Sequence, residues 1–109
     1  MIYVTLDSIP GKKVSSVLGL VRGNTIRARH MGRDILAGLK SLVGGEIEDY
    51  TKMLAEAREQ SIDRMLEEAK SLGANAVLGI RFSTSYMMSN ASEILVFGTA
   101  VILEDDLES

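Results

Sequence analysis

Few residues of this chain could bind a metal ion. Its single histidine, His30, is followed directly by Met31, and Met87 and Met88 add two further thioethers. Thioethers favour Cu(I)-type ions. The chain has no cysteine, which excludes disulfides, zinc-thiolate sites and thiol nucleophiles. The pattern fits a surface histidine beside a methionine that begins a helix better than it fits a metal site at His30 and Met31.

Arginines provide a second candidate site, for an anion. Four of them form a local basic group in the first third of the chain: Arg22, Arg27, Arg29 and Arg33. Arginines at the start of a helix can hold a phosphate or another anion. However, Gly44-Gly45-Glu46 lacks the lysine and hydroxyl residue of a phosphate loop. Solvated charge or a salt bridge at a subunit interface remains the alternative.

Arg58 is a third candidate, because the helical pattern places it inside an apolar stripe. A cation buried there without a partner would cost several kcal/mol. We therefore expect a carboxylate or carbonyl partner, such as Glu68 or Asp34 of the same or a neighbouring chain. A bound anion is the other interpretation.

Catalysis has little support in the sequence. His30 has no identifiable proton relay, and a spatial triad cannot be recognised from one sequence. The acidic pairs Glu67-Glu68 and Asp105-Asp106 fit a solvated helix face and a tail better than an acid–base dyad. We expect no catalytic residues and no established reaction.

The stretch that must position these groups is residues 46–77, read as a long amphipathic helix that turns into a strand. At 100° per residue its apolar residues share one broad side. They are Ile47, Tyr50, Leu54, Ala57, Ile62, Met65, Ala69 and Leu72, with Arg58 and Ser61 among them. Gly73 is the expected C-terminal cap and Asn75 the expected turn former.

The remaining segments predict strands and one shorter helix. Strands are expected at residues 2–5, 13–22 and 25–28, with a turn at Gly23-Asn24. A helix over residues 31–43 ends at Gly44-Gly45. Residues 76–86 alternate, with Ala76, Leu78, Ile80, Phe82 and Tyr86 on one face, and a loop covers residues 87–91. The continuously apolar strand 92–103 should be central and form an antiparallel hairpin with its predecessor.

This order predicts an α+β fold, a small antiparallel sheet with one short and one long helix packed on it. At 109 residues the chain is most simply one domain, residues 1–109. A net charge of −3 and a pI near 5.1 argue against nucleic-acid binding. With no signal peptide and no apolar run of membrane-spanning length, a cytoplasmic protein is expected.

A family resemblance rests on residues spread over nearly the whole chain. They are Gly19, Arg33-Asp34, Gly44-Gly45, Tyr50, Ala57-Arg58, the run from Ala69 through Gly73-Ala74-Asn75-Ala76-Val77 to Gly79, and Phe97-Gly98-Thr99-Ala100-Val101. Together they resemble the YbjQ-like family of uncharacterised proteins, which is sometimes labelled a "putative heavy-metal-binding" domain. At position 61 the resemblance implies alanine, where this chain has Ser61.

The resemblance implies a dodecin-like α+β subunit that assembles into a ring-shaped homopentamer. It implies no established reaction and leaves the cofactor unknown. From it we expect a homopentameric binding module for metal ions or small anions. A ring that presents acidic helix faces to a protein partner is the alternative, and a hydrolase is the least supported one.

Overall fold

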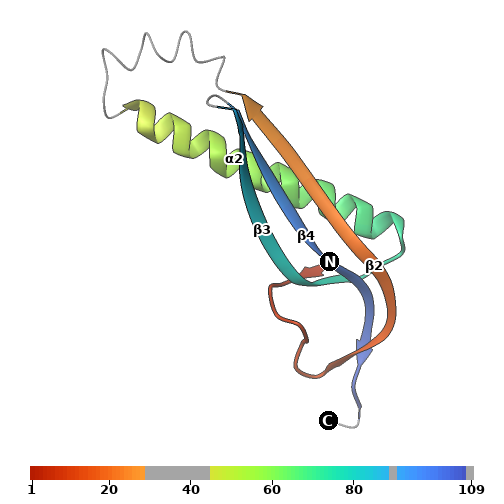
Figure 1. Cartoon of the computed structure of the whole chain (residues 1–109). Helices are drawn as coiled ribbons and strands as arrows, with labels where there is room; N and C mark the ends of the chain where they lie inside the picture. Colours follow the sequence, from red (N-terminus) through yellow and green to blue (C-terminus); the bar gives the residue numbers. More distant parts are fainter. Residues whose placement is uncertain (29–44, 89–90, 108–109) are drawn as a thin grey trace.

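The computed structural model describes residues 1–28, 45–88 and 91–107 (Figure 1). The elements are β1 (Ile2–Tyr3), β2 (Lys12–Ala28), α2 (Gly45–Ser71), β3 (Ala76–Met88) and β4 (Ala91–Asp105). The four strands form one sheet in the order β1-β3-β4-β2, with α2 lying across it. The predicted helix over residues 31–43 and the turn residue Gly44 lie outside the described residues.

The sheet is mixed, which corrects the expected all-antiparallel sheet. β3 and β4 form the predicted antiparallel hairpin, and β4 is central because β2 pairs antiparallel with its other edge. β1 instead runs parallel to β3, with Ile2 opposite Ala76. A parallel neighbour requires a long crossover, and here the crossover contains β2 and α2. The α+β class is therefore confirmed.

β2 is one continuous strand, so the predicted turn at Gly23-Asn24 is wrong. Gly23 is a point of contact between the strand and α2 instead. A Cβ atom added at Gly23 would overlap the Ser61 carbonyl oxygen and lie 2.6 Å from the Met65 backbone nitrogen. Glycine in a strand interior often marks such a close backbone approach. Glycine is therefore needed at position 23 for close packing against α2 and not for a turn.

β3 changes face at Gly79, which corrects the predicted alternation. The register shifts between Leu78 and Arg81, and Gly79 has a φ of +62°, as in a glycine β-bulge. Leu78 and Ile80 therefore belong to different clusters on opposite sides of the sheet. The predicted loop over residues 87–91 is also too long, because β3 extends to Met88 and β4 begins at Ala91.

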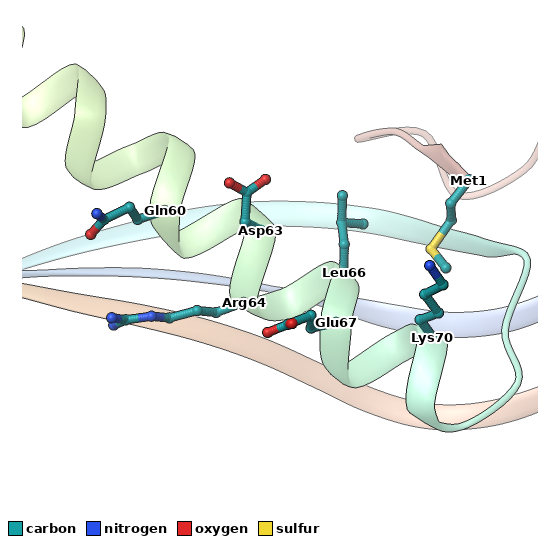
Figure 2. A pocket seen from close by; sticks show the side chains of 7 residues that line it. All are labelled: Met1, Gln60, Asp63, Arg64, Leu66, Glu67 and Lys70. Carbon is teal, nitrogen blue, oxygen red and sulfur yellow. The ribbon is translucent and has the colours of Figure 1, made fainter.

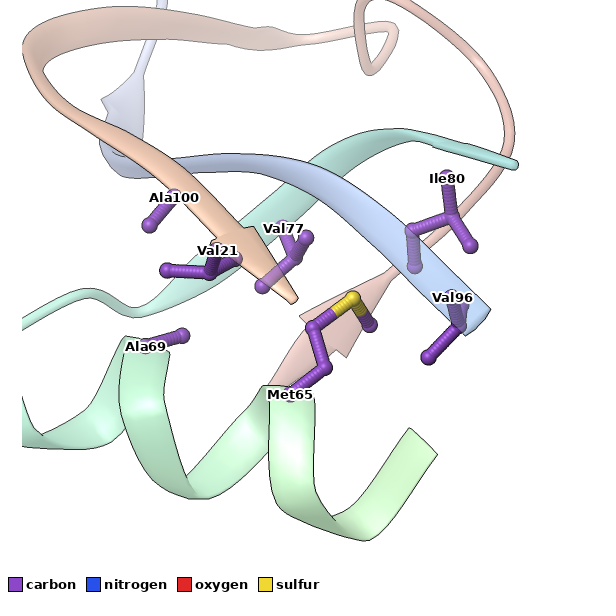
Figure 3. Packing of buried hydrophobic residues seen from close by; sticks show 7 residues of the cluster. All are labelled: Val21, Met65, Ala69, Val77, Ile80, Val96 and Ala100. Carbon is purple, nitrogen blue, oxygen red and sulfur yellow. The ribbon is translucent and has the colours of Figure 1, made fainter. Parts of the chain in front are cut away.

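The main core lies between α2 and the sheet, and Figure 3 shows its side chains converging. Its buried members are Val21, Met65, Ala69, Val77, Ile80, Val96 and Ala100. On α2 the fully buried positions recur every four residues, at Ala57, Ser61, Met65 and Ala69. This line confirms the predicted helix, because residues four apart share one face.

The end of α2 is capped as the sequence predicts. Gly73 has a φ of +85°, and its N–H donates to the Lys70 carbonyl at 3.0 Å. The Ala74 N–H donates to the Ala69 carbonyl at 3.1 Å. These two bonds are those of a Schellman motif, which glycine favours at the left-handed position.

Asn75 does more than form a turn. Its side-chain amide donates to the Leu103 carbonyl at 2.9 Å, and its side-chain oxygen accepts from the Leu103 N–H at 2.7 Å. The Asn75 N–H donates to the Val101 carbonyl. Asn75 therefore prolongs the pairing with β4 and guides the chain from α2 into β3.

The side of the sheet that faces away from α2 is here called the open face. The N-terminal segment covers one end of it, where Val4 and Ile9 pack on a second buried cluster. That cluster is Ala76, Leu78, Val101 and Leu103. Beyond it, the open face carries Val17, Leu20, Arg22 and Ile26 from β2, Leu95 and Phe97 from β4, and Arg81 from β3.

Candidate functional site

The metal site predicted at His30 and Met31 stays a prediction, because both residues lie outside the described residues. Among the residues that are described, no group of three or more His, Cys, Asp or Glu side chains could hold a metal ion. The described donor set therefore does not fit a metal site.

The basic group is only partly visible. Arg29 and Arg33 lie outside the described residues, as does the side chain of Arg27. Arg22 is exposed on the open face. It makes no ion pair or hydrogen bond with any residue that the structure describes.

Arg58 is exposed, so the prediction that it lies within the buried stripe is wrong. The buried line through Ala57 and Ser61 is narrow, and Arg58 falls just outside it. Neither expected partner, Glu68 or Asp34, pairs with it: within the described residues Arg58 has no ion pair, and Asp34 lies beyond them. Its guanidinium group is therefore available to solvent or to a neighbouring molecule.

Ser61 is fully buried, as the helical pattern predicts, and forms a small hydroxyl cluster. Its Oγ lies 2.8 Å from the Thr25 Oγ1. The Ser61 hydroxyl can also donate to the Ala57 carbonyl at 2.9 Å or to the Ile94 carbonyl at 3.2 Å. This cluster joins α2, β2 and β4. The sequence pattern missed Thr25, whose only signal was its place two residues beyond Gly23.

A row across the open face was also missed. Arg22, Phe97 and Arg81 occupy directly opposed positions on β2, β4 and β3. The guanidinium of Arg81 donates to the Thr5 and Ile80 carbonyls at 2.9 and 2.8 Å, which ties the N-terminal segment to the sheet. The predicted alternation placed Arg81 on the polar face of its strand, but not beside an aromatic ring.

Figure 2 shows a pocket of about 610 Å³ along the outer side of α2. Its lining residues are Met1, Gln60, Asp63, Arg64, Leu66, Glu67 and Lys70. The Arg64 guanidinium donates to the Asn24 carbonyl at 2.6 Å, so it is partly committed to the fold. Acidic and basic side chains alternate around this pocket, and therefore it favours no single class of charged ligand.

A second pocket, of about 600 Å³, shares Met1 and Lys70 with the first. It also contacts Lys12, whose Nζ lies 2.5 Å from an Asp105 carboxylate oxygen. This hydrogen bond and the charge of Lys12 lower the pKa of Asp105 from its ordinary value. Asn75, which also lines the pocket, is bonded to Leu103. These polar groups therefore bond each other rather than converge on a ligand.

The open face has the third pocket, of about 280 Å³, and its walls are largely apolar. Its lining residues are Asp7, Val14, Val17, Leu78, Gly79, Thr99 and Val101. Val17 and Leu20 beside it are 67% and 63% exposed. An exposed apolar patch with a recess is typical of a site that contacts another molecule.

No helix among the described residues is long and apolar enough to cross a membrane.

Comparison with known proteins supports the family resemblance over nearly the whole chain. A family model described as "putative heavy-metal-binding" matches residues 1–104. A UPF0145 protein of Dehalococcoides mccartyi strain 195 is 60% identical over 104 residues, covering 95% of this chain and 100% of that one. A UPF0145 protein of Thermus thermophilus is 59% identical over 100 residues, covering 92% and 88% of the two chains.

A crystal structure shows the same fold at lower identity. It is a protein of unknown function from Pediococcus pentosaceus, assigned to the DUF74 family, with a TM-score of 0.65 and 13% identity. The match covers 95% of this chain and 98% of that one. The sequence matches decide the family, and the structural match supports the fold alone. The chain therefore belongs to the YbjQ-like UPF0145 family.

Proposed function

We propose that this chain is one subunit of a closed, ring-shaped homo-oligomer, a homopentamer, which serves as a binding module without catalytic activity. The observation that carries the proposal is an apolar face of the sheet that the described part of the chain leaves open, where Val17, Leu20 and Ile26 are 67%, 63% and 52% exposed. An exposed apolar patch of this kind is typical of a surface that contacts another molecule.

The ligand proposed for this ring is a metal ion or a small anion at the subunit junctions. Among the described residues, an anion site has more support than a metal site, because Arg22 and Arg58 are exposed and make no ion pair with another described residue. Guanidinium groups bind carboxylate and phosphate through paired hydrogen bonds. A metal site would depend on His30 and Met31, which lie outside those residues.

The first experiment is a measurement of mass. Light scattering and native mass spectrometry of the purified chain at micromolar concentration should give a homopentamer. A monomer at that concentration would refute the proposed assembly. The same native spectra, recorded after gentle desalting, should show whether a phosphorylated or carboxylated metabolite remains bound.

The second experiment tests the ligand. The purified oligomer is titrated calorimetrically with inorganic phosphate, Cu(I), Zn(II) and Ni(II), each against Arg58→Met and His30→Ala variants. Anion binding that Arg58→Met weakens supports the arginine site, and metal uptake that His30→Ala abolishes supports the other. No stoichiometric uptake of any probe would remove the binding module as a function.

A second candidate function rests on the outer side of α2. Its exposed residues there include Glu56, Glu59, Asp63 and Glu67. A ring of such helices would present acidic surfaces to a basic protein partner. An experimental structure of the assembly distinguishes the two functions: bound ligand at the junctions supports the first, and well-packed empty junctions support the second.

A further inference from the structure

Two arginines flank an aromatic ring on the open face. Arg22 on β2 and Arg81 on β3 both stand directly opposite Phe97 on β4, and the three are here called the arginine row. Both arginines are exposed, and Arg22 makes no ion pair or hydrogen bond with any residue that the structure describes. Neighbouring strands lie about 4.8 Å apart, so the backbones of the two arginines are about 10 Å apart. Guanidinium groups bind carboxylates through paired hydrogen bonds.

Arg81 is held in position by the N-terminal segment. Its Nη1 donates to the Thr5 and Ile80 carbonyls at 2.9 and 2.8 Å. A guanidinium group has five N–H donors, and those on Nε and Nη2 of Arg81 have no partner among the described residues. A side chain that is already fixed loses less conformational entropy when it binds a ligand. Arg81 is therefore a preorganised donor for an acidic group.

The pocket of about 280 Å³ lies next to the arginine row along the strands. Its walls include Thr99 and Val101, which stand two and four residues beyond Phe97 on the same face of β4. At about 3.3 Å per residue, Val101 lies about 13 Å from Phe97. Val17 and Leu20, which are 67% and 63% exposed, line the same stretch on β2. One apolar surface therefore leads from the arginines into the pocket.

The acidic residues of the open face determine the orientation of a charged ligand. Asp7 lines the pocket beside Gly79, so a second carboxylate would be repelled from that end. Glu93 lies four residues from Phe97 in the other direction along β4, and it accepts a hydrogen bond from the Asn24 amide at 3.2 Å. The arginine row lies between these two carboxylates. An acidic group is therefore favoured at the row, with an apolar chain directed into the pocket.

We propose that the open face binds an amphipathic carboxylate of the medium-chain fatty acid class. Its carboxylate lies on Arg22 and Arg81, and its chain passes Leu20 into the pocket. The inference rests on the proposed binding of a small anion and names the chemistry of that anion. A wholly apolar ligand would leave both guanidinium groups without an acceptor, and inorganic phosphate would leave the apolar surface exposed.

Calorimetric titration of the purified chain with sodium octanoate, below its critical micelle concentration, tests this site. We expect one octanoate per chain, bound at least tenfold more tightly than acetate, which lacks the chain, and than octanol, which lacks the charge. Acetate or octanol binding as tightly as octanoate would refute the inference. Uptake of phosphate or metal without octanoate binding would refute it and leave the proposed function standing, whereas no uptake of any probe would refute both.

Variants with matched controls locate the bound octanoate. Arg22→Gln should weaken its binding at least tenfold, whereas Lys70→Gln, which removes an exposed cation of α2, should leave it unchanged. Val17→Asp places a carboxylate beside the pocket and should weaken binding similarly, unlike Leu72→Asp directly after α2. Circular dichroism checks that each variant is folded.

Two results with these proteins would contradict the site. Equal effects of the open-face variants and their controls would mean that octanoate responds to net charge alone. Octanoate binding that weakens as protein concentration rises would show that a second copy of the chain takes its place. Either result would refute the inference, and the second would leave the proposed assembly standing.

Discussion

The two faces of the sheet carry similar apolar residues, but one face is buried and the other is exposed. Toward α2, Val21, Val96 and Ala100 are completely or almost completely buried. On the open face of the same strands, Val17 and Leu20 are more than half exposed. Residue type therefore does not decide burial here. The position of the helix does, because α2 covers one face of β2 and β4 and leaves the other face exposed.

Side chains pack closely on the side of the sheet that faces α2, here called the helix face. Small groups stand where α2 meets the sheet: Gly23 beneath the helix, and Ala57 and Ser61 on it. They allow the backbones to approach closely, and Met65 fills the space that remains (Figure 3). The open face has larger side chains and no such close approach, so substitutions should be tolerated differently on the two faces.

The largest loss of stability is expected from adding side-chain volume at Gly23, beneath α2. Gly23→Val should lower the free energy of unfolding by about 4 kcal/mol, because the new atoms overlap the Ser61 and Met65 backbone. Urea denaturation at one fixed protein concentration measures the loss. Asn24→Ala, which removes only an exposed hydrogen bond to the Glu93 carboxylate at 3.2 Å, should cost no more than about 1 kcal/mol. Equal losses would mean that the close approach is not real.

Removing volume from the same face should have the next largest effect. Met65 is fully buried, and Met65→Ala should cost about 3 kcal/mol through lost apolar burial and a cavity. Leu72→Ala is the control, since Leu72 directly follows the last residue of the same helix and is 46% exposed. Thermal unfolding followed by circular dichroism should separate the two clearly, and a Met65→Ala transition at the wild-type temperature would contradict this core.

A double-mutant cycle sharpens the comparison at the buried hydroxyls. Ser61→Ala leaves the Thr25 hydroxyl without its partner, and the loss should be about 1.5 kcal/mol. Thr25→Val together with Ser61→Ala should recover most of it, because both partners are then apolar. Additive losses in urea denaturation would instead show that the two hydroxyls act independently.

The smallest effect is expected at the end of the sheet, where Lys12 pairs with Asp105. Lys12 lowers the pKa of Asp105 in the folded chain, so the pair contributes stability above the unfolded carboxyl pKa of about 3.9. That contribution is lost as the pH falls through the lower folded value. Lys12→Met should therefore reduce stability slightly at neutral pH and flatten the decline in acid.

The control for this pH effect is Lys70→Met, which removes an equal charge and no ion pair among the described residues. Its stability should decline in acid as steeply as that of the wild type. Urea denaturation from pH 2 to 7 compares the three proteins. An unchanged acid decline in Lys12→Met would exclude the pair as its source.

The sequence predicted elements best where one local pattern had one structural meaning. The four-residue spacing from Ala57 to Ala69 and the glycine at position 73 predicted both the helix and its cap. The continuous apolar run of β4 predicted a central strand, since such a strand is covered on both faces. The hairpin with β3 followed from the short connection between them.

Three glycines show where prediction from one sequence ends. Gly23 permits a close approach, Gly73 a left-handed cap and Gly79 a bulge. Local sequence cannot distinguish these causes, because each needs only the absence of a side chain. Similarly, Arg58 and Ser61 both fit the helical stripe, and only the narrow contact with the sheet buries one and exposes the other.

The sequence by itself determined the family, the α+β class, the long helix with its cap, and the central hairpin. The helix, its cap and the hairpin depend on periodicity and on residues close in the chain, whereas the family depends on a series of short motifs along nearly the whole chain. Only the tertiary structure decided that β2 is continuous, that β1 pairs parallel with β3, and which apolar side of the sheet stays uncovered. The physical reason is that both sides of β2 are apolar, so its burial depends on where a distant helix packs.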